Sequence, residues 1–215
     1  MIKIGIDVGS TTAKLVAVDE NDNLLFSKYE RHNAKAKETI LSFLKELLSE
    51  IGDKDISVRI TGSIGMGISE KCSLPFVQEV VAAAKAIQKD YSHVTSMIDI
   101  GGEDAKVVFF KDAEATDLRM NGNCAGGTGA FIDQMAIILG VNIDELNQLA
   151  MNATQVYPIA SRCGVFCKTD IQNLIAKNIP KEDIAASIFH AVTVQTIVTL
   201  AHGCDIVAPI LLCGG

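Results

Sequence analysis

Short apolar runs alternate with longer amphipathic stretches along the first half of the chain. The first three runs, residues 2–7, 13–19 and 23–29, are joined by short turns and predict a three-strand meander. A short buried strand is predicted at 58–63, between two helices. Apolar positions three and four residues apart predict one face of each helix: Ile40, Leu44, Leu47, Leu48 and Ile51 in the first, and Val77, Val80, Val81, Ala84 and Ile87 in the second.

The second half of the chain repeats this order of elements. Strands are predicted at 96–99, 105–110 and 115–121, and a last one at 206–215. Between them, three helical patterns carry apolar faces: Phe131, Ile132, Met135 and Leu139; Phe166, Ile171, Leu174 and Ile175; Ile184, Ile188, Ala191, Val192 and Val198.

An internal repeat underlies the similarity of the two halves. Residues 6–16, IDVGSTTAKLV, and residues 98–108, IDIGGEDAKVV, match at six of eleven positions with a constant offset of 92. We therefore predict an α/β protein made of two copies of one unit, residues 1–92 and 93–215, facing each other across a cleft. The second copy stops at Gly215 without the helix that follows its counterpart strand in the first, so we expect the natural polypeptide to continue.

Composition narrows the class of protein. The 215 residues are 48% hydrophobic and carry a formal charge of −7 without a basic run, which argues against nucleic-acid binding but not against nucleotides. We see no secretory signal, and polar residues interrupt the most apolar stretch, 183–212, so we predict a cytoplasmic protein without a membrane span. Its six cysteines are then expected to be reduced thiols, suited to metal binding or core packing.

Each copy of the repeat places an aspartate and glycines where a strand turns. Glycine lets the backbone turn sharply with exposed N–H groups, and two such turns could hold a polyphosphate. Asp7 and Asp99 could hold Mg²⁺ through water, and Ser10, Thr11 and Thr12 add hydroxyl groups. The alternative is that each turn only closes a hairpin. No Walker motif is present, and 61–67 is interpreted as a strand-to-helix turn.

Two cysteines precede predicted helices. Cys124 lies in the glycine-rich stretch 121–131, NGNCAGGTGAF, and Cys163 precedes the helical pattern that contains Phe166. A helix N-terminus favours a thiolate, as it favours other anions. Two thiolates from each of two chains could hold a four-iron, four-sulfur cluster. The alternative is that both cysteines are buried apolar residues.

The quoted motifs resemble known ATPases. GIDVGSTTAK and DIGGEDAK resemble the two phosphate loops of the actin, sugar-kinase and heat-shock-chaperone ATPase superfamily, and LLCGG resembles the start of its adenosine loop, Gly214 and Gly215. The resemblance implies two ribonuclease-H-like domains with ATP between them. NGNCAGGTGAFIDQMA and RCGVFCKTD further resemble the activator ATPases of 2-hydroxyacyl-CoA dehydratases and the ATPase subunits of benzoyl-CoA reductases, across essentially all 215 residues.

That resemblance implies an electron-donating ATPase. Cys124 and Cys163 match the ligands of a 4Fe-4S cluster shared by a homodimer, and ATP hydrolysis would drive one electron from it into a CoA-ester dehydratase or reductase. A ferredoxin or flavodoxin would supply the electron. Two residues depart from the family pattern: Cys167 is an extra thiol, in the core or near the cluster, and Glu103 replaces the usual glutamine. The sequence also resembles the N-terminal ATPase region of longer activase-like proteins.

These observations define the candidate site. Mg·ATP would be held by the segments around both turns, the glycine-rich stretch and the chain end, and ADP would be left after hydrolysis. Glu79, at the start of a helix, is the candidate that orients the attacking water, although it could equally be an exposed helix glutamate. The nucleotide-binding candidates are Gly9, Ser10, Thr11, Thr12 and Lys14; Gly101, Gly102 and Glu103; Gly126, Gly127 and Thr128; and Gly214 and Gly215.

Two other functions stay open at this point. One is a small-molecule kinase of the same superfamily without a cluster, although the low aromatic content of 5% offers little for sugar stacking. The other is a truncated nucleotide-binding scaffold. The four histidines, His32, His93, His190 and His202, show no metal-ligand spacing and are interpreted as surface or core residues.

Overall fold

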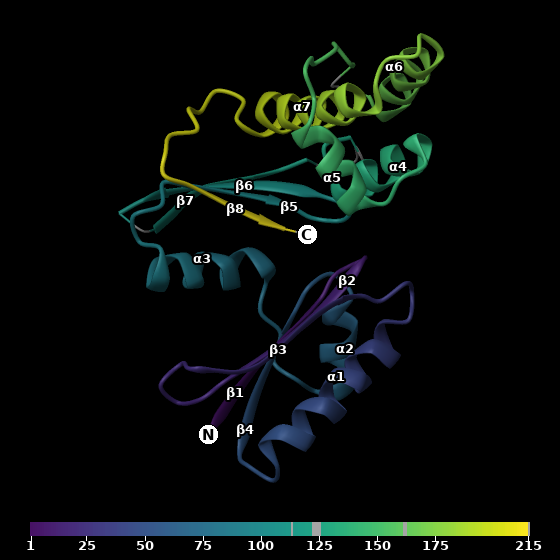
Figure 1. Cartoon of the computed structure of the whole chain (residues 1–215). Helices are drawn as coiled ribbons and strands as arrows, with labels where there is room; N and C mark the ends of the chain where they lie inside the picture. Colours follow the sequence, from purple (N-terminus) through teal and green to yellow (C-terminus); the bar gives the residue numbers. More distant parts are fainter. Residues whose placement is uncertain (113, 122–125, 161–162, 215) are drawn as a thin grey trace. The chain divides into compact units, whose positions relative to one another are not determined.

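The sheets and helices follow the predicted order (Figure 1). The computed structural model describes residues 1–112, 114–121, 126–160 and 163–214. The chain divides into two compact units, Met1–Tyr91 and a second that begins at Ser92. Each unit holds one four-stranded sheet, so the duplicated α/β architecture predicted from the repeat is confirmed.

The sheet of the first unit has the strand order β3-β2-β1-β4. Its strands are β1 (Ile2–Val8), β2 (Thr12–Val18), β3 (Leu24–Arg31) and β4 (Ile56–Thr61). The first three form the predicted antiparallel meander, and β4 lies parallel to β1. Pairing in register places Asp7 beside both Lys14 on β2 and Thr61 on β4.

Alternate residues of β1 form the core of the first unit. Ile2, Ile4, Ile6 and Val8 are buried, and they cluster with apolar residues of α1 (Ala36–Ile51). Burial of these side chains is the main force that holds the helix to the sheet. The predicted face of α1 is largely confirmed, but Phe43 takes the place of Leu48, which is 56% exposed. Two further helices, α2 (Gly65–Cys72) and α3 (Glu79–Asp90), complete the unit.

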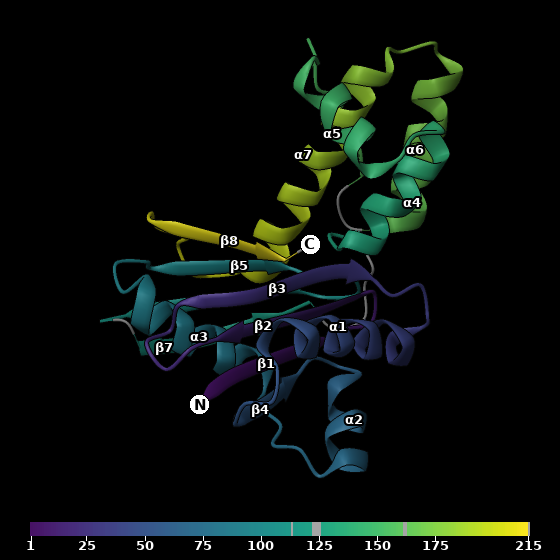
Figure 2. The same ribbon diagram turned by 60° about the horizontal axis from the view of Figure 1, so that its bottom comes forward.

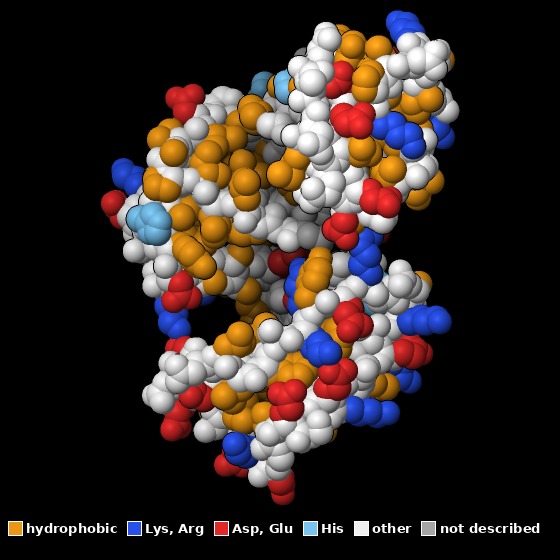
Figure 3. Space-filling model, in the orientation of Figure 1, with side chains coloured by type: hydrophobic (Ala, Val, Ile, Leu, Met, Phe, Trp, Pro, Cys, Tyr) orange, Lys and Arg blue, Asp and Glu red, His pale blue; other side chains and the backbone are white. Residues whose placement is uncertain are grey.

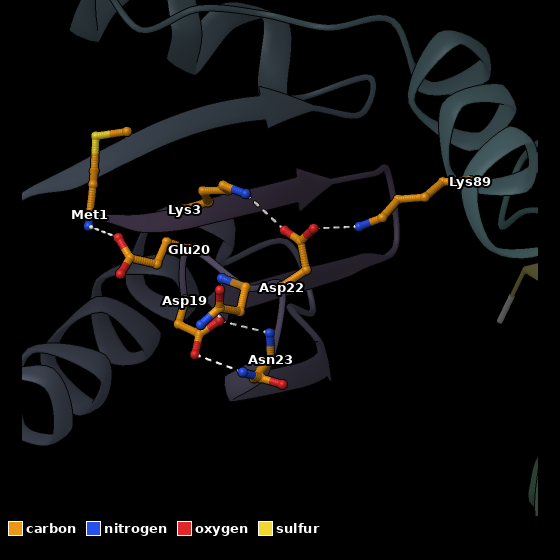
Figure 4. A network of polar contacts seen from close by, with 8 residues as sticks. Met1, Lys3, Asp19, Glu20, Asp22, Asn23 and Lys89 are labelled. Atoms are coloured by element: carbon orange, nitrogen blue, oxygen red, sulfur yellow. Dashed lines mark hydrogen bonds and ion pairs between the residues drawn. The ribbon is translucent and has the colours of Figure 1, made fainter.

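A polar network connects the turn after β2 to the rest of the first unit (Figure 4). The Asp22 carboxylate accepts hydrogen bonds from Lys3 Nζ at 2.8 Å and from Lys89 Nζ of α3 at 2.6 Å. Asp19 closes the same turn by accepting from the backbone and side chain of Asn23. The network therefore joins β1, the β2–β3 turn and the last turn of α3.

The sheet of the second unit has the strand order β7-β6-β5-β8, the same topology as the first. Its strands are β5 (Ser96–Ile100), β6 (Ala105–Lys111), β7 (Glu114–Met120) and β8 (Ile210–Gly214). Strand β8 lies parallel to β5, as β4 lies parallel to β1. It is shorter than the predicted run 206–215, which includes a cis peptide bond before Pro209.

Four helices belong to the second unit: α4 (Gly129–Leu139), α5 (Ile143–Met151), α6 (Gly164–Ala176) and α7 (Lys181–Leu200). Figure 2 shows them grouped beside the sheet of that unit. Sequence patterns predicted three of them and missed α5, which begins with a capping box between Asn142 and Glu145. Three side chains placed on apolar faces are exposed instead: Phe166 at 65%, Val198 at 48% and Ile175 at 39%.

Helix α7 is long and apolar enough to cross a membrane by length and composition alone. However, 56% of its apolar window is buried inside the protein, where Ile184, Ile188 and Val192 pack in the helical core. It is the one such helix within the described residues. On the face drawn in Figure 3, lysine and arginine side chains are interspersed with aspartate and glutamate.

Candidate phosphate-binding loops

The first candidate loop connects β1 to β2. The amide of Gly9 donates to the carbonyl of Thr12 at 3.0 Å, which closes a tight turn around Ser10 and Thr11. Both of these residues are half-buried. Their backbone amides have no hydrogen-bond partner within the part of the chain that the structure describes. The turn therefore presents two successive N–H donors, the arrangement that forms an anion-binding nest.

The second candidate loop repeats this geometry 92 residues later. The amide of Gly101 donates to the carbonyl of Asp104 at 2.8 Å, and Gly102 and Glu103 occupy the positions of Ser10 and Thr11. Their amides also lack a partner among the described residues. The repeat seen in the sequence is thus a repeat of hydrogen bonding, and both loops offer the same pair of donors.

An acidic and a basic side chain face each other beside the first loop. Lys14 Nζ lies 3.0 Å from Asp7 Oδ2, and the pair is partly buried. The other oxygen, Asp7 Oδ1, is buried and has no hydrogen-bond partner in the described structure, and the same is true of Thr61 Oγ1 on the neighbouring strand. An unpaired buried polar atom costs about 1–3 kcal/mol, so both oxygens favour a bound water or cation. Carboxylate and water oxygens are the ligands that Mg²⁺ prefers, so this donor set fits a hydrated magnesium ion.

Glycines bring a second strand end close to each loop. Gly62, directly after β4, has φ +91°, and a Cβ there would lie 2.4 Å from the carbonyl oxygen of Val8 and 2.5 Å from Asp7 Oδ1. Gly214, at the end of β8, has φ +114°, and a Cβ would lie 2.1 Å from the carbonyl oxygen of Ile100. Only glycine adopts these conformations without a clash. Gly215 lies outside the described residues.

A cavity of about 300 Å³ adjoins Asp7 in the first unit. Asp7, Lys14, Arg59 and Thr61 are its polar lining residues, and the other lining residues include the apolar Val77 and Ala82. Glu79 is half-buried and is the first residue of α3, the helix that contributes Ala82. The candidate that orients water therefore belongs to a segment that borders the same cavity as Asp7.

The second unit has charged residues at the equivalent strand positions. Asp99 pairs in register with Lys106, as Asp7 does with Lys14, and Lys106 Nζ, which is buried, lies 3.2 Å from Asp104 Oδ2. On the other side, Asp99 pairs in register with Cys213 of β8. Partial burial and the negative charge of Asp99 both disfavour a thiolate, and they raise the pKa of Cys213.

The first residues of α4 donate hydrogen bonds to the second loop. The amides of Gly129 and Ala130 donate to the carbonyls of Gly101 and Gly102, both at 2.8 Å. Gly126, Gly127 and Thr128 are buried just before the helix. These two amides of α4 are therefore engaged by the loop carbonyls, whereas nucleotide binding by Gly126, Gly127 and Thr128 stays a prediction.

The cysteines predicted to hold a cluster are only partly described. Cys124 lies outside the described residues. Cys163 is half-buried and precedes the first residue of α6, and the exposed apolar side chains of Val165 and Phe166 follow it. Cys167 is 3% exposed and its thiol donates to the carbonyl of Ala160, so it belongs to the core. No group of three metal-binding side chains occurs among the described residues.

Two residues near the first loop were missed in the sequence. Thr61, the last residue of β4, and Gly62 begin the stretch 61–67, which the sequence predicts as a strand-to-helix turn, and this stretch does lead from β4 into α2. The sequence does contain a signal for them. The pair Thr61 and Gly62 resembles residues 213–214 of the second unit, since in both units a short apolar run is followed by a small residue and a glycine.

Comparisons with known proteins agree over the whole chain. The model of the BadF/BadG/BcrA/BcrD ATPase family matches residues 4–215. The (R)-2-hydroxyglutaryl-CoA dehydratase activating ATPase of Acidaminococcus fermentans is 28% identical over 214 residues, 99% of this chain and 82% of the relative. The 2-hydroxyisocaproyl-CoA dehydratase activator of Clostridioides difficile is 29% identical over an alignment that covers 100% of this chain and 81% of the relative.

Solved structures show the same similarity. Component A of the A. fermentans (R)-2-hydroxyglutaryl-CoA dehydratase superposes with a TM-score of 0.90 at 28% identity, covering 100% of this chain and 83% of that one. The activator of the C. difficile 2-hydroxyisocaproyl-CoA dehydratase, with bound ADPNP, superposes with a TM-score of 0.88 at 28% identity. This match covers 100% of this chain and 80% of the activator chain. The fold is shared by the ethanolamine utilization protein EutJ of Carboxydothermus hydrogenoformans, which has 13% identity and a TM-score of 0.64. That match covers 100% of this chain and 76% of the EutJ chain. The predicted actin-like ATPase fold is therefore confirmed.

Proposed function

The chain belongs to the BadF/BadG/BcrA/BcrD ATPase family, and from this premise we propose that it is an ATP-hydrolysing electron donor that activates a CoA-ester dehydratase or reductase. Two relatives whose names describe activators of such dehydratases support the choice of partner. A relative crystallised with ADPNP supports the choice of nucleotide. In this proposal ADP is the product that the loops release.

The single observation that carries the ATPase proposal is the repeated loop geometry. Each loop is closed by the same backbone hydrogen bond and presents two unpaired amides, at Ser10 and Thr11 and at Gly102 and Glu103, as far as the described residues show. Successive free amides bind phosphate oxygens because their partial positive charges converge on the anion. We propose that both loops bind phosphate groups of the nucleotide, with the hydroxyl groups of Ser10, Thr11 and Thr12 as further donors.

The side chains beside the first loop would bind the metal that accompanies ATP. Asp7 Oδ1 and Thr61 Oγ1 are buried without partners among the described residues, and they would hydrogen bond to waters of a magnesium ion. Lys14 neutralises part of the Asp7 charge and keeps the carboxylate oriented. Asp99 would act in the same way beside the second loop. Glu79 would orient the attacking water, since this hydrolysis depends mainly on positioning and charge stabilisation.

The residues around Cys163 fit an iron-sulfur ligand. Its half-buried thiol belongs to the N-cap residue of α6, and the N-terminus of a helix is a favourable place for a negatively charged cluster. We propose Cys163 and Cys124 as the two ligands that each subunit of a homodimer gives to one 4Fe-4S cluster. When bound, the cluster would supply a low-potential electron. Val165 and Phe166, exposed beside Cys163, would be covered by the second subunit.

Other partners follow from this proposal. The electron acceptor would be a CoA-ester dehydratase or reductase, and a ferredoxin or flavodoxin would return the electron. A cytoplasmic location suits both the oxygen-sensitive group and these partners. Nucleic acid and membrane are not part of the proposed function.

The test is to measure iron, acid-labile sulfide and molecular mass after anaerobic reconstitution of the full chain. About two irons per chain in a dimer would support the shared cluster. Replacement Cys163→Ser should remove the iron and leave ADPNP binding unchanged, whereas Cys72→Ser, at an exposed cysteine of α2, should change neither. Full iron content in Cys163→Ser would contradict the ligand assignment.

One observation favours a second function, a small-molecule kinase. The cavity beside Asp7 has room for a small acceptor, and its walls are mainly apolar. A kinase would transfer the terminal phosphate to that acceptor, whereas the proposed ATPase releases inorganic phosphate. Phosphate release equal to ADP formation, without any added acceptor, would therefore argue against the kinase.

A further inference from the structure

His32 differs from the other histidines of the chain in its surroundings. It follows the last residue of β3 and is 4% exposed, whereas His93, His190 and His202 are exposed. It lies 23 positions beyond Gly9 in the sequence, yet its ring reaches the first phosphate loop. Its Nε2 atom is 3.0 Å from the carbonyl oxygen of Gly9.

The main chain of His32 contacts the same loop. Its amide donates to the carbonyl of Thr11 at 3.2 Å, and its own carbonyl accepts from the amide of Lys35 at 2.7 Å. With the Gly9 to Thr12 bond, the carbonyls of Gly9, Thr11 and Thr12 all have donors. Among the described residues, the amides of Ser10 and Thr11 are then backbone N–H donors of the loop that remain free for a ligand.

The hydrogen bond also defines which ring nitrogen carries a proton. A carbonyl oxygen only accepts, so Nε2 must be the donor. Nδ1 is buried and has no partner among the described residues. The buried His32 ring therefore donates a hydrogen bond from Nε2 to the Gly9 carbonyl of the loop.

In the second loop, the carbonyl equivalent to that of Gly9 also accepts a hydrogen bond, but the donor belongs to a helix. The carbonyl of Gly101, which is equivalent to that of Gly9, accepts from the amide of Gly129 at the start of α4. At the Gly9 carbonyl of the first unit, the His32 ring supplies the donor instead. Both loops are thus held at equivalent carbonyls, one by a helix amide and one by a side chain.

From these contacts we propose that His32 is a positioning residue, which fixes the first phosphate loop in the conformation that presents the Ser10 and Thr11 amides to the nucleotide. This inference rests on the proposed ATP binding for its ligand, but the order of the loop can be measured without any ligand. Loss of the ring donor would leave the Gly9 carbonyl unpaired and let the turn rotate.

The test compares His32→Gln with His32→Asn in the full chain. Both side chains are neutral amides, but only that of glutamine is long enough to place a donor near the position of Nε2. We expect His32→Gln to bind Mg·ADPNP about as tightly as the wild type and His32→Asn to bind it about tenfold more weakly, as for the loss of one buried hydrogen bond. His93→Asn, at an exposed histidine, is the control and should bind as the wild type does.

Hydrogen exchange of residues 7–16 in the ligand-free chain is the second readout. These amides should exchange faster in His32→Asn and at the wild-type rate in His32→Gln. Equal exchange and equal affinity in the two variants would overturn the proposal. If His32→Asn does not fold, His32→Phe keeps the ring without the donor, and wild-type loop protection in that variant would contradict it.

The two proposals fail in different ways. A wild-type chain that binds no Mg·ADPNP would overturn the proposed ATPase, whereas the exchange of residues 7–16 would still decide whether His32 holds the loop. Normal nucleotide binding together with unchanged exchange in His32→Asn would overturn the role of His32 alone.

Discussion

Lys14 Nζ lies 3.0 Å from Asp7 Oδ2, on the strand that pairs with β1, while the other oxygen of the same carboxylate is buried without a partner in the described structure. One half of the carboxylate is therefore neutralised by the protein, and the other half is available to a water or a cation. The divided surroundings of Asp7 give the first prediction.

Asp7→Asn should lower the rate of Mg-dependent ATP hydrolysis on the order of 100-fold, as the loss of one preorganised charge contact does in other active sites. The substitution also removes the ion pair between this position and Lys14. Steady-state phosphate release checks this, and Asp53→Asn, at an exposed carboxylate, should keep the wild-type rate. Unchanged hydrolysis in Asp7→Asn would remove Asp7 from the metal site.

Gly62→Ala should destabilise the first unit by about 1–3 kcal/mol, because an alanine at φ +91° is strained and its Cβ meets the Val8 carbonyl and the Asp7 carboxylate. Thermal or urea unfolding measures the change. The matched control is Gly67→Ala in α2, where a Cβ would meet open space. That variant should be as stable as the wild type or gain roughly 0.5–1 kcal/mol, because alanine favours helix.

Asp22→Asn should lower stability near neutral pH and have no effect in strong acid. Hydrogen bonds from Lys3 and Lys89 lower the pKa of Asp22 from 3.8 to about 2 in the folded chain. A lowered pKa contributes stability above pH 3.8, and this is lost as the pH falls through about 2. Asparagine tolerates the positive φ of 63° at this position, so the backbone is not the cause.

The measurement for Asp22 is the difference in melting temperature between variant and wild type across pH and salt. The difference should shrink in high salt, because the carboxylate is at the surface and ions screen it. A difference that stays constant from neutral pH to pH 2 would show that the ion pairs do not contribute.

Cys213 should react with iodoacetamide several-fold more slowly than Cys72 at roughly pH 8, although both residues are exposed. Partial desolvation of the Cys213 thiol and the charge of Asp99 raise its pKa, so less thiolate is present at a given pH. Mass spectrometry of labelled peptides gives both rates in one sample. Asp99→Asn should speed the labelling of Cys213 and leave that of Cys72 unchanged. Equal labelling rates of Cys213 in wild type and variant would show that the Asp99 charge does not affect this thiol.

Much of the fold could be predicted because its signals are local. The alternation of apolar residues in 2–7 and 13–19 reflects a strand with one buried face, and the offset of 92 residues between the repeats identified the second unit. The two tight turns that follow β1 and β5 were also predicted, because glycines after a strand mark sharp turns. Helix α5 was missed because its nine residues are too few for a clear period.

The details of the site depended on contacts between distant residues. Nothing in the sequence near His32 indicates that its ring holds Gly9, and the amides of α4 support the second loop although 28 positions separate Gly101 from Gly129. The exposure of Phe166 likewise contradicts its place in an apolar pattern.

The sequence by itself therefore determined the order of the elements, the duplication and the family, since each of these is encoded by residues close together along the chain. Only the tertiary structure decided which donors hold the two loops and, within the described residues, which oxygens of Asp7 and Thr61 are left unpaired. The physical reason is that a buried hydrogen-bonding group must find its partner in space, and strand pairing and helix packing determine which group lies within reach.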